Sequence, residues 1–170
     1  MRYILRTCAG REHYVDYVKK CIPSVEICFD QGFGAMGNFL QSLEMSGDDA
    51  VVNLEDDIWI TNNFEEKLKA VVSDKPSSVI QFFSMRKADL TEGSRWDSGR
   101  SYLMAQCTYF PEKMSRGILA FSKKYDNITH KSHPLDSMVA DYLNKARMKY
   151  WIHCPSLVDH RVGKSMIDPR

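Results

Sequence analysis

The sequence predicts an α/β domain built on a mostly parallel sheet with helices on its faces. The first half of the chain alternates short apolar runs with segments whose apolar residues recur at helical spacing, which is the pattern of strand–helix units. The chain has 170 residues, of which 44% are hydrophobic and 26% charged, an ordinary composition for one globular domain. We therefore expect residues 1–170 to form a single domain with a buried core, and we exclude disordered and low-complexity classes.

The elements of the first half follow in a regular order. Asn63 is placed to cap the helix that starts at Phe64, with Glu66 as its capping-box partner. Ligands bind beyond the carboxyl ends of the strands in such sheets, here after Thr7, Phe29 and Leu54. The predicted elements are, in order, strand 3–7, helix 12–21, strand 25–29, helix 38–45, strand 50–54, a helix from residue 64 and strand 78–84.

The second half is less regular. Residues 85–99 are polar and contain Gly93 and Gly99, so we expect a long loop there. Pro134 suits the first turn of a helix, and the apolar residues after it keep helical spacing. The remaining predicted elements are strand 102–110, helix 111–125, the helix from residue 134, strand 148–154 and a tail over 156–170.

The net charge of +1 hides an asymmetry between the two halves. Residues 1–85 hold 8 Lys/Arg and 13 Asp/Glu, whereas residues 86–170 hold 15 and 9. An acidic half joined to a basic half indicates a site where an acid cluster meets an anionic ligand, although solvated helix faces would give the same pattern.

Cysteine spacing and hydropathy bear on the compartment. The five cysteines show no C-x-x-C spacing, so we expect reduced thiols. No apolar stretch approaches the ~18 residues of a membrane span, and Arg6 and Arg11 come too early for a signal-peptide core. The expected location is the cytoplasm.

Three consecutive acids follow the third predicted strand. If strand geometry continues, Glu55 and Asp57 point to one side and Asp56 to the other. Like-charge repulsion among them would be relieved by a divalent cation, and carboxylate oxygens suit Mg²⁺ or Mn²⁺. The structural alternative is an acidic turn ahead of the helix at Phe64, whose N-terminus favours carboxylates.

The segment Leu54-Glu55-Asp56-Asp57 resembles the metal-binding LEDD segment of nucleotide-sugar glycosyltransferases of the GT-A fold, in particular those of the lipopolysaccharide and collagen galactosyltransferase type. Residues 155–160 (PSLVDH) resemble that family's PSLV-x-H segment. Residues 105–109 resemble the small-polar-aromatic stretch before its acceptor-side helix, and residues 134–136 resemble its later P-x-D element. The likeness is loose between these motifs, and the chain is short for the family. It implies a single GT-A-like domain over residues 1–170, with residues 1–85 as the nucleotide-sugar and metal half and residues 86–170 as the acceptor half and C-terminal tail.

The resemblance also implies an activity and a set of roles. The implied reaction moves a sugar from a nucleoside diphosphate sugar, most often a UDP sugar, to a hydroxyl acceptor. Mn²⁺ or Mg²⁺ would be held by Asp57 and His160, and Asp136 would take the proton of the acceptor. A purely structural role, as a surface, tail or first-turn charge, stays open for these residues. The implied donor-binding residues are Thr7, Arg11, Asp30, Glu55, Asp56, Lys164 and Ser165.

A second motif supports an alternative enzyme class. Residues 32–37 (GFGAMG) match G-x-G-x-x-G between a predicted strand and a predicted helix, with acids about 20 residues later. That context is typical of an NAD(P)-dependent oxidoreductase. A whole strand–helix unit precedes the motif, however, whereas the fingerprint usually opens the fold.

The basic second half indicates a nucleic-acid contact. Arg86, Arg95, Trp96 and Arg100 combine positive charge with an aromatic ring, as in nucleic-acid surfaces, so a non-enzymatic binding module is a further alternative. The glycosyltransferase and nucleic-acid-binding hypotheses combine if the acceptor is duplex DNA with hydroxymethylated cytosine, as in small bacteriophage glycosyltransferases. The location would then be the host cytoplasm, and residues 86–99 would form the loop that flips a base. The rival acceptor is a cell-surface glycan. The oligomeric state is not predicted.

Overall fold

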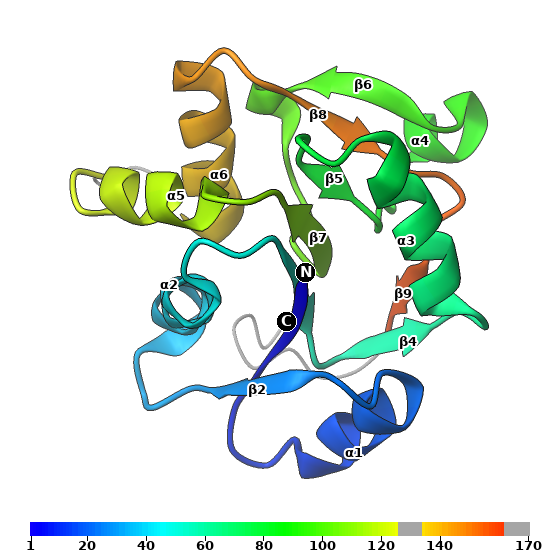
Figure 1. Ribbon diagram of the computed structural model, residues 1–170, viewed down its shortest axis with the longest axis vertical. Coiled ribbons are helices and arrows are strands. Elements are labelled where there is room, and N and C mark those ends of the chain that lie inside the picture. Colours follow the sequence, from blue (N-terminus) through cyan, green and yellow to red (C-terminus); the bar gives the residue numbers. More distant parts are fainter. Residues whose placement is uncertain (126–133, 162–170) are drawn as a thin grey trace.

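A seven-stranded sheet forms the centre of the protein (Figure 1). In sequence order its strands are β1 (Arg2–Thr7), β2 (Glu26–Phe29), β3 (Val51–Glu55), β5 (Ile80–Gln81), β6 (Arg95–Ser98), β7 (Cys107–Phe110) and β8 (Lys149–Ile152). The computed structural model describes residues 1–125 and 134–161.

The sheet is mixed but mostly parallel. Its strand order is β2-β1-β3-β7-β5-β8-β6. Strands β1, β2 and β3 are mutually parallel, as are β5 and β8, whereas β7 is antiparallel to both its neighbours and β6 is antiparallel to β8. The predicted fold class, α/β with a mostly parallel sheet flanked by helices, is confirmed, and both halves of the chain contribute strands to one sheet.

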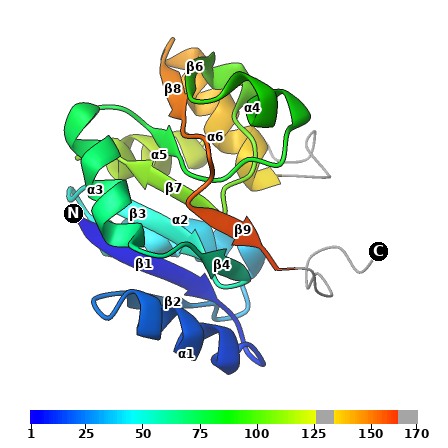
Figure 2. The same ribbon diagram turned by 90° about the vertical axis from the view of Figure 1, so that its right-hand side faces the viewer.

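Helices cover both faces of the sheet (Figures 1 and 2). Neighbouring strand residues point to opposite faces, so Leu5 packs with Val18 and Leu68 on one side, and Ile4 packs with Phe39 on the other. The first side is covered by α1 and α3, and the second by α2, α5 and α6. The helices are α1 (Glu12–Cys21), α2 (Gly34–Ser46), α3 (Phe64–Asp74), α4 (Lys87–Glu92), α5 (Met114–Ser122) and α6 (Pro134–Lys145).

A second, two-stranded sheet lies beside the first. Strand β4 (Ile58–Ile60) pairs antiparallel with β9 (Val158–His160), as Figure 2 shows, and Ile58 is the register partner of His160. The sequence predicts a tail over 156–170 and no strand after the acids, and both expectations are wrong over these residues. Three-residue strands are too short to carry an alternation signal, so this pairing depends on contacts distant in sequence.

The expected loop over 85–99 contains α4 and β6. Its polar residues suggest a loop, but the structure pairs them with one another, and β6 takes the edge of the sheet next to β8. A short 3-10 turn, η1 (Gly99–Ser101), follows. The predicted strands 78–84 and 102–110 are observed as the shorter β5 and β7. Beyond β5, the N–H of Phe82 still donates to the carbonyl of Cys107, and the N–H of Trp151 donates to the carbonyl of Val79.

The starts of two helices also differ from the prediction. Asn63 has a left-handed backbone (φ 56°) and makes no side-chain cap, so the predicted capping box with Glu66 is wrong. Helix α2 starts four residues earlier than expected, at Gly34, because Asp30 accepts hydrogen bonds from the amides of the preceding turn.

The cysteines and the helix lengths bear on two further expectations. All five cysteines are free thiols, as expected. In the described part of the chain, no helix combines the length and the hydrophobicity needed to cross a bilayer.

Candidate functional site

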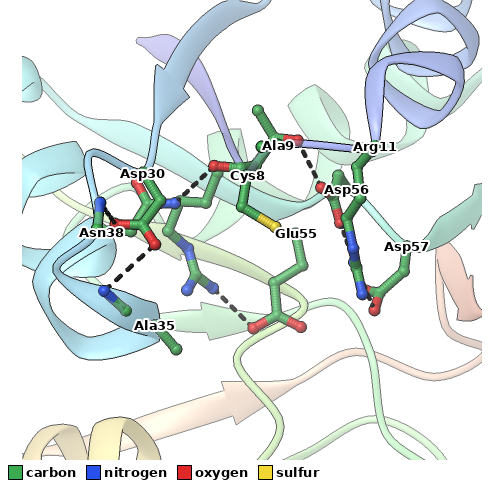
Figure 3. Close-up of a pocket in the computed structure, with 13 residues that line it drawn as sticks. Cys8, Ala9, Arg11, Asp30, Ala35, Asn38, Glu55, Asp56 and Asp57 are labelled. Carbon is green, nitrogen blue, oxygen red and sulfur yellow. Dashed lines mark hydrogen bonds and ion pairs between the residues drawn. The ribbon is translucent and has the colours of Figure 1, made fainter. Parts of the chain in front are cut away.

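A pocket of about 470 Å³ opens at the carboxyl ends of β1, β2 and β3 (Figure 3). Parallel α/β sheets bind ligands at this edge, and the three places named from the sequence border the same pocket. Figure 3 shows Asp30, Ala35 and Asn38 on one side and Arg11, Asp56 and Asp57 on the other. The lining residues are Arg6, Thr7, Cys8, Ala9, Arg11, Asp30, Gly32, Gly34, Ala35, Asn38, Glu55, Asp56 and Asp57.

An arginine joins two of the three acids. The guanidinium of Arg11 donates to Asp56 and, at 3.1 Å, to Oδ2 of Asp57. The Thr7 hydroxyl donates to the other oxygen of Asp56 at 2.6 Å. Burial lowers the pKa of Arg11, but the bonds and charges of the two carboxylates outweigh burial and raise that pKa.

This contact changes the expected geometry of the acids. The chain bends at 56–57, so the alternation that would separate the two aspartates ends at Glu55, and one guanidinium reaches both. Asp56 is only 3% exposed, and both its oxygens are bonded within the protein. Its position suits the anchoring of Thr7 and Arg11 better than direct contact with a ligand.

Glu55 contacts a second, buried arginine. Arg6, 5% exposed, donates to Glu55 Oε1 at 3.0 Å and to Asn53 Oδ1 at 2.6 Å. Burial raises the pKa of Glu55, the Arg6 charge lowers it, and the charges of Asp57 and Asp136 raise it again, with a net rise. Arg6 is not among the predicted site residues; the signal that the sequence offers is one charged residue inside the apolar run 3–7.

Asp57 and His160 lie together although they are distant in sequence. The pairing of β4 with β9 brings His160 Nε2 to 3.5 Å from Asp57 Oδ2, and Oδ1 of Asp57 is buried and accepts no hydrogen bond from the described residues. A carboxylate with an imidazole nitrogen near one oxygen and no hydrogen bond to the other offers oxygen and nitrogen donors that fit a Mn²⁺ or Mg²⁺ ion whose other ligands are phosphate and water. Among residues 1–125 and 134–161, no three His, Cys, Asp or Glu side chains form a complete metal site.

The glycine motif borders the pocket, but an acid already fills its amide cradle. The carboxylate of Asp30 accepts hydrogen bonds from the backbone N–H groups of Gly32, Phe33 and Gly34 at 2.9–3.2 Å. Gly32 and Gly34 have φ of +95° and +70°, which glycine adopts without strain. These are the N–H groups that would meet a pyrophosphate in a dinucleotide fingerprint, and β2 is an edge strand of the sheet.

Three predicted site residues remain: Asp136, Lys164 and Ser165. Asp136 is in the first turn of α6, and its charge raises the pKa of Glu55 and, after burial, that of Tyr102. Its electrostatic reach therefore includes the pocket, and its role as base stays a prediction. Lys164 and Ser165 lie outside the described residues.

Two predicted acceptor residues, Arg86 and Arg95, are paired within the protein. Arg86 Nε donates to Asp89 Oδ2 at 2.8 Å, and Arg95 forms an ion pair with Asp89 Oδ1. Asp89 is fully buried; burial raises its pKa, but hydrogen bonds from Ser84 and both arginines outweigh burial and lower it. These contacts give both arginines a structural role.

The other two predicted acceptor residues are exposed. Trp96 is 45% exposed and meets Trp151 edge-on with ring centroids 5.4 Å apart, and Arg100 lies in η1. Trp96 belongs to β6 and Arg100 follows that strand, at the opposite edge of the sheet from β2, so neither lines the pocket. Contact with an acceptor stays a prediction for all four residues.

Comparison with known proteins gives a fold but no family. The sequence matches no protein-family model and no curated protein. Among solved structures, A197 from STIV is similar over 96% of this chain and 87% of that chain, with a TM-score of 0.52 and 14% identity. A protein described as a glucose-1-phosphate thymidylyltransferase from Bacillus anthracis covers 92% and 90%, with a TM-score of 0.48 and 9% identity, too low to support an argument. The likeness to A197 extends to the fold alone, and the topology is consistent with the expected GT-A-like arrangement.

Proposed function

We propose that this protein is a metal-dependent glycosyltransferase that uses a nucleoside diphosphate sugar, with UDP as the first nucleotide to test. One observation carries the proposal: the acids after β3 and His160 of β9 meet beside a pocket at the carboxyl edge of the sheet. Within residues 1–125 and 134–161, one buried oxygen of Asp57 has no hydrogen bond, and a cation would satisfy it.

Each residue of the site would have its own role in the transfer. Asp57 and His160 would hold Mn²⁺ or Mg²⁺, which supplies positive charge for the departing diphosphate. Arg11 would add a second positive charge near the diphosphate, and its ion pair with Asp56 fixes the position of its guanidinium. Glu55 faces the pocket with a raised pKa, suited to a hydrogen bond with a donor hydroxyl. Asp136 would take the acceptor's proton.

The acceptor is proposed only as a hydroxyl group. Hydroxymethylated duplex DNA and a cell-surface glycan are the two acceptors to compare, by transfer of label from a UDP sugar. Because Arg86 and Arg95 hold Asp89, the DNA test belongs with Arg100→Glu, which changes an exposed charge without breaking that cluster. Label transfer to DNA that falls with Arg100→Glu would support DNA, and label on the glycan alone would exclude it.

The hydrogen bonds that Asp30 accepts disfavour the oxidoreductase alternative. A dinucleotide at residues 32–37 would have to displace that carboxylate from three amides and then bring its own negative phosphates next to it.

Thermal unfolding with UDP, with Mn²⁺, with both, and with NADH tests the proposal. A ligand at 100 times its dissociation constant stabilises a protein by about 2.7 kcal/mol, which is about 5–10 °C for a domain of this size. We expect a shift of this size only when UDP and Mn²⁺ are present together. A shift with NADH alone would contradict the proposal.

A matched pair of variants identifies the site of binding. Asp57→Asn should remove the joint shift. Asp49 is an exposed carboxylate that precedes β3, at the end of the strand remote from the pocket, and Asp49→Asn should keep the joint shift. Equal shifts in both variants would show that UDP and Mn²⁺ bind elsewhere.

A further inference from the structure

Arg161 directly follows β9, and aromatic rings surround its guanidinium. The central carbon of that group lies 3.7 Å from the ring centroid of Trp59, 4.3 Å from that of Tyr17 and 4.9 Å from that of Tyr14. Trp59 belongs to β4 and the tyrosines to α1, and Tyr17 meets Trp59 edge-on at 5.3 Å. One side chain thus joins three segments through cation–π contacts.

The same residue extends the pairing of β4 with β9. Its backbone N–H donates to the carbonyl of Asp57 at 2.8 Å, and its Nε donates to the carbonyl of Ile58 at 2.9 Å. Both carbonyls belong to the segment that carries the proposed metal ligand. Arg161 is therefore bonded to the residue that His160 approaches and to the register partner of His160.

The small sheet needs such support. It contains three residue pairs, from Ile58–His160 to Ile60–Val158, and its strands are not part of the seven-stranded sheet. A two-stranded pair of this length is marginal in water. The aromatic cage gives its His160 end a packed attachment to α1. Tyr14 also contacts Arg11, whose guanidinium carbon lies 5.6 Å from the ring centroid, so the cage touches the proposed donor site at a second point.

We propose that Arg161 is a positioning residue for the metal–diphosphate site and acts through His160. Held by Trp59, Tyr17 and Tyr14, it fixes the end of β9 so that the imidazole stays beside Asp57. This inference rests on the proposed function for its effect on UDP binding. Its effect on the place of His160 does not depend on that function.

The binding test compares Arg161→Met and Arg161→Lys with a matched control. The control is Lys145→Met on α6, which removes a cation that lies 5.7 Å from the ring centroid of Phe121 on α5. By analogy with groups that orient metal ligands, Arg161→Met should weaken Mn²⁺-dependent UDP binding by about 10-fold to 100-fold. Arg161→Lys, which keeps the cation, should restore binding to within about threefold of the wild type. Lys145→Met should not change it.

A double-mutant cycle separates positioning from general destabilisation. In a His160→Asn background, Arg161→Met should cause no further loss of UDP affinity, since the group it positions is gone. The same fold-loss in both backgrounds would overturn the proposal, as would equal losses in Arg161→Met and Lys145→Met.

A readout without UDP keeps this claim distinct from the proposed function. The imidazole NMR signals of His160, identified by their absence in His160→Asn, should shift in Arg161→Met and stay in place in Lys145→Met. Unmoved signals in Arg161→Met would overturn the positioning role whether or not UDP binds. Moved signals without any binding of UDP and Mn²⁺ by the wild type would support the positioning role and reject the proposed function.

Discussion

Two clusters of aspartate and arginine lie in different parts of the molecule, and their chemistry is similar. In each, a nearly inaccessible aspartate pairs with arginine and accepts a hydroxyl hydrogen bond, from Thr7 to Asp56 in one and from Ser84 to Asp89 in the other. The pocket cluster consists of Thr7, Arg11, Asp56, Asp57 and His160. The β6 cluster consists of Ser84, Arg86, Asp89, Arg95 and Asp97.

The clusters differ in the binding capacity that remains. Each oxygen of Asp89 faces an arginine, and the side chain has no exposed surface. Asp57, in contrast, borders a pocket, and no hydrogen bond or ion pair from the described residues reaches its buried Oδ1, whereas Oδ1 of Asp89 pairs with Arg95. A buried charged side chain is therefore weak evidence for a ligand site by itself. A cavity next to a carboxylate oxygen that has no partner is stronger evidence.

The largest difference is expected in sugar transfer. Asp57→Asn should lower the rate at least about a hundredfold, a loss of about 2.7 kcal/mol of transition-state stabilisation, because the amide cannot replace the charge of a metal ligand. Asp89→Asn should leave the rate per folded molecule unchanged. Initial rates with a UDP sugar, corrected for the folded fraction, test both. An Asp57→Asn enzyme with more than a tenth of wild-type activity would contradict the proposed role.

The reverse order is expected for stability. Asp89→Asn leaves two arginines without their buried counter-ion and should cost about 2 kcal/mol, less than for a fully buried pair because both arginines are partly exposed. Urea unfolding measures this loss, and Asp57→Asn should change stability less. No loss in Asp89→Asn would show that the β6 cluster is not structural.

The stability difference should also depend on pH. The pKa of Asp89 is lowered in the folded protein, so its stabilisation is fully present above the unfolded pKa of about 3.9 and is lost as the pH falls through the folded value. The gap between wild type and Asp89→Asn should therefore be full at pH 7 and shrink in acid. A gap of constant size would contradict the lowered pKa.

Arg11 tests whether the pocket cluster combines both roles. Arg11→Met removes the partner of Asp56, which is 3% exposed, and should cost about 1 kcal/mol while weakening UDP binding. Arg11→Lys keeps the charge but not the planar fork that reaches two carboxylates, so it should recover part of each loss. Unfolding and UDP titration on the same samples give both values. A loss of stability without any change in UDP binding would make Arg11 purely structural.

The strands and helices with strong local patterns are predictable from the sequence. Helix α1 matches the predicted range 12–21, and β1 to β3 lie within one residue of the predicted runs, because apolar spacing and Pro23 act locally. The same order places Thr7, Asp30 and the acids of 55–57 at one edge of a parallel sheet, where the structure has its pocket.

What the sequence does not reveal depends on partners distant in the chain. Strands β4 and β9 are three residues each and exist through their mutual pairing, and the polar segment 85–99 folds because Asp89 neutralises two arginines. The contact of Arg11 with both Asp56 and Asp57 likewise follows from a bend that has no sequence signal. Arg161 falls within the expected tail, so its aromatic contacts become visible only in three dimensions.

The smallest expected effect concerns Glu55, where burial and neighbouring acids oppose an arginine. Its pKa is raised in the folded protein, so folding favours the protonated form: the wild type is relatively more stable below the unfolded pKa of about 4.3 and loses that gain as the pH rises through the folded value. Glu55→Gln has no carboxyl group to ionise, so it does not lose stability as the pH rises. It should be more stable than wild type at pH 7, by less than about 1 kcal/mol, with the difference gone below about pH 4.

Melting curves of both proteins at pH 4 and pH 7 measure this difference. Glu66→Gln, an exposed acid in the first turn of α3, is the control and should bring no gain at pH 7. If Glu55→Gln were instead less stable than wild type at pH 7, the ion pair with Arg6 would outweigh the cost of burying the charge. Glu55 would then resemble Asp89, an acid held for structure, and the contrast between the two clusters would rest on Asp57 and His160 alone.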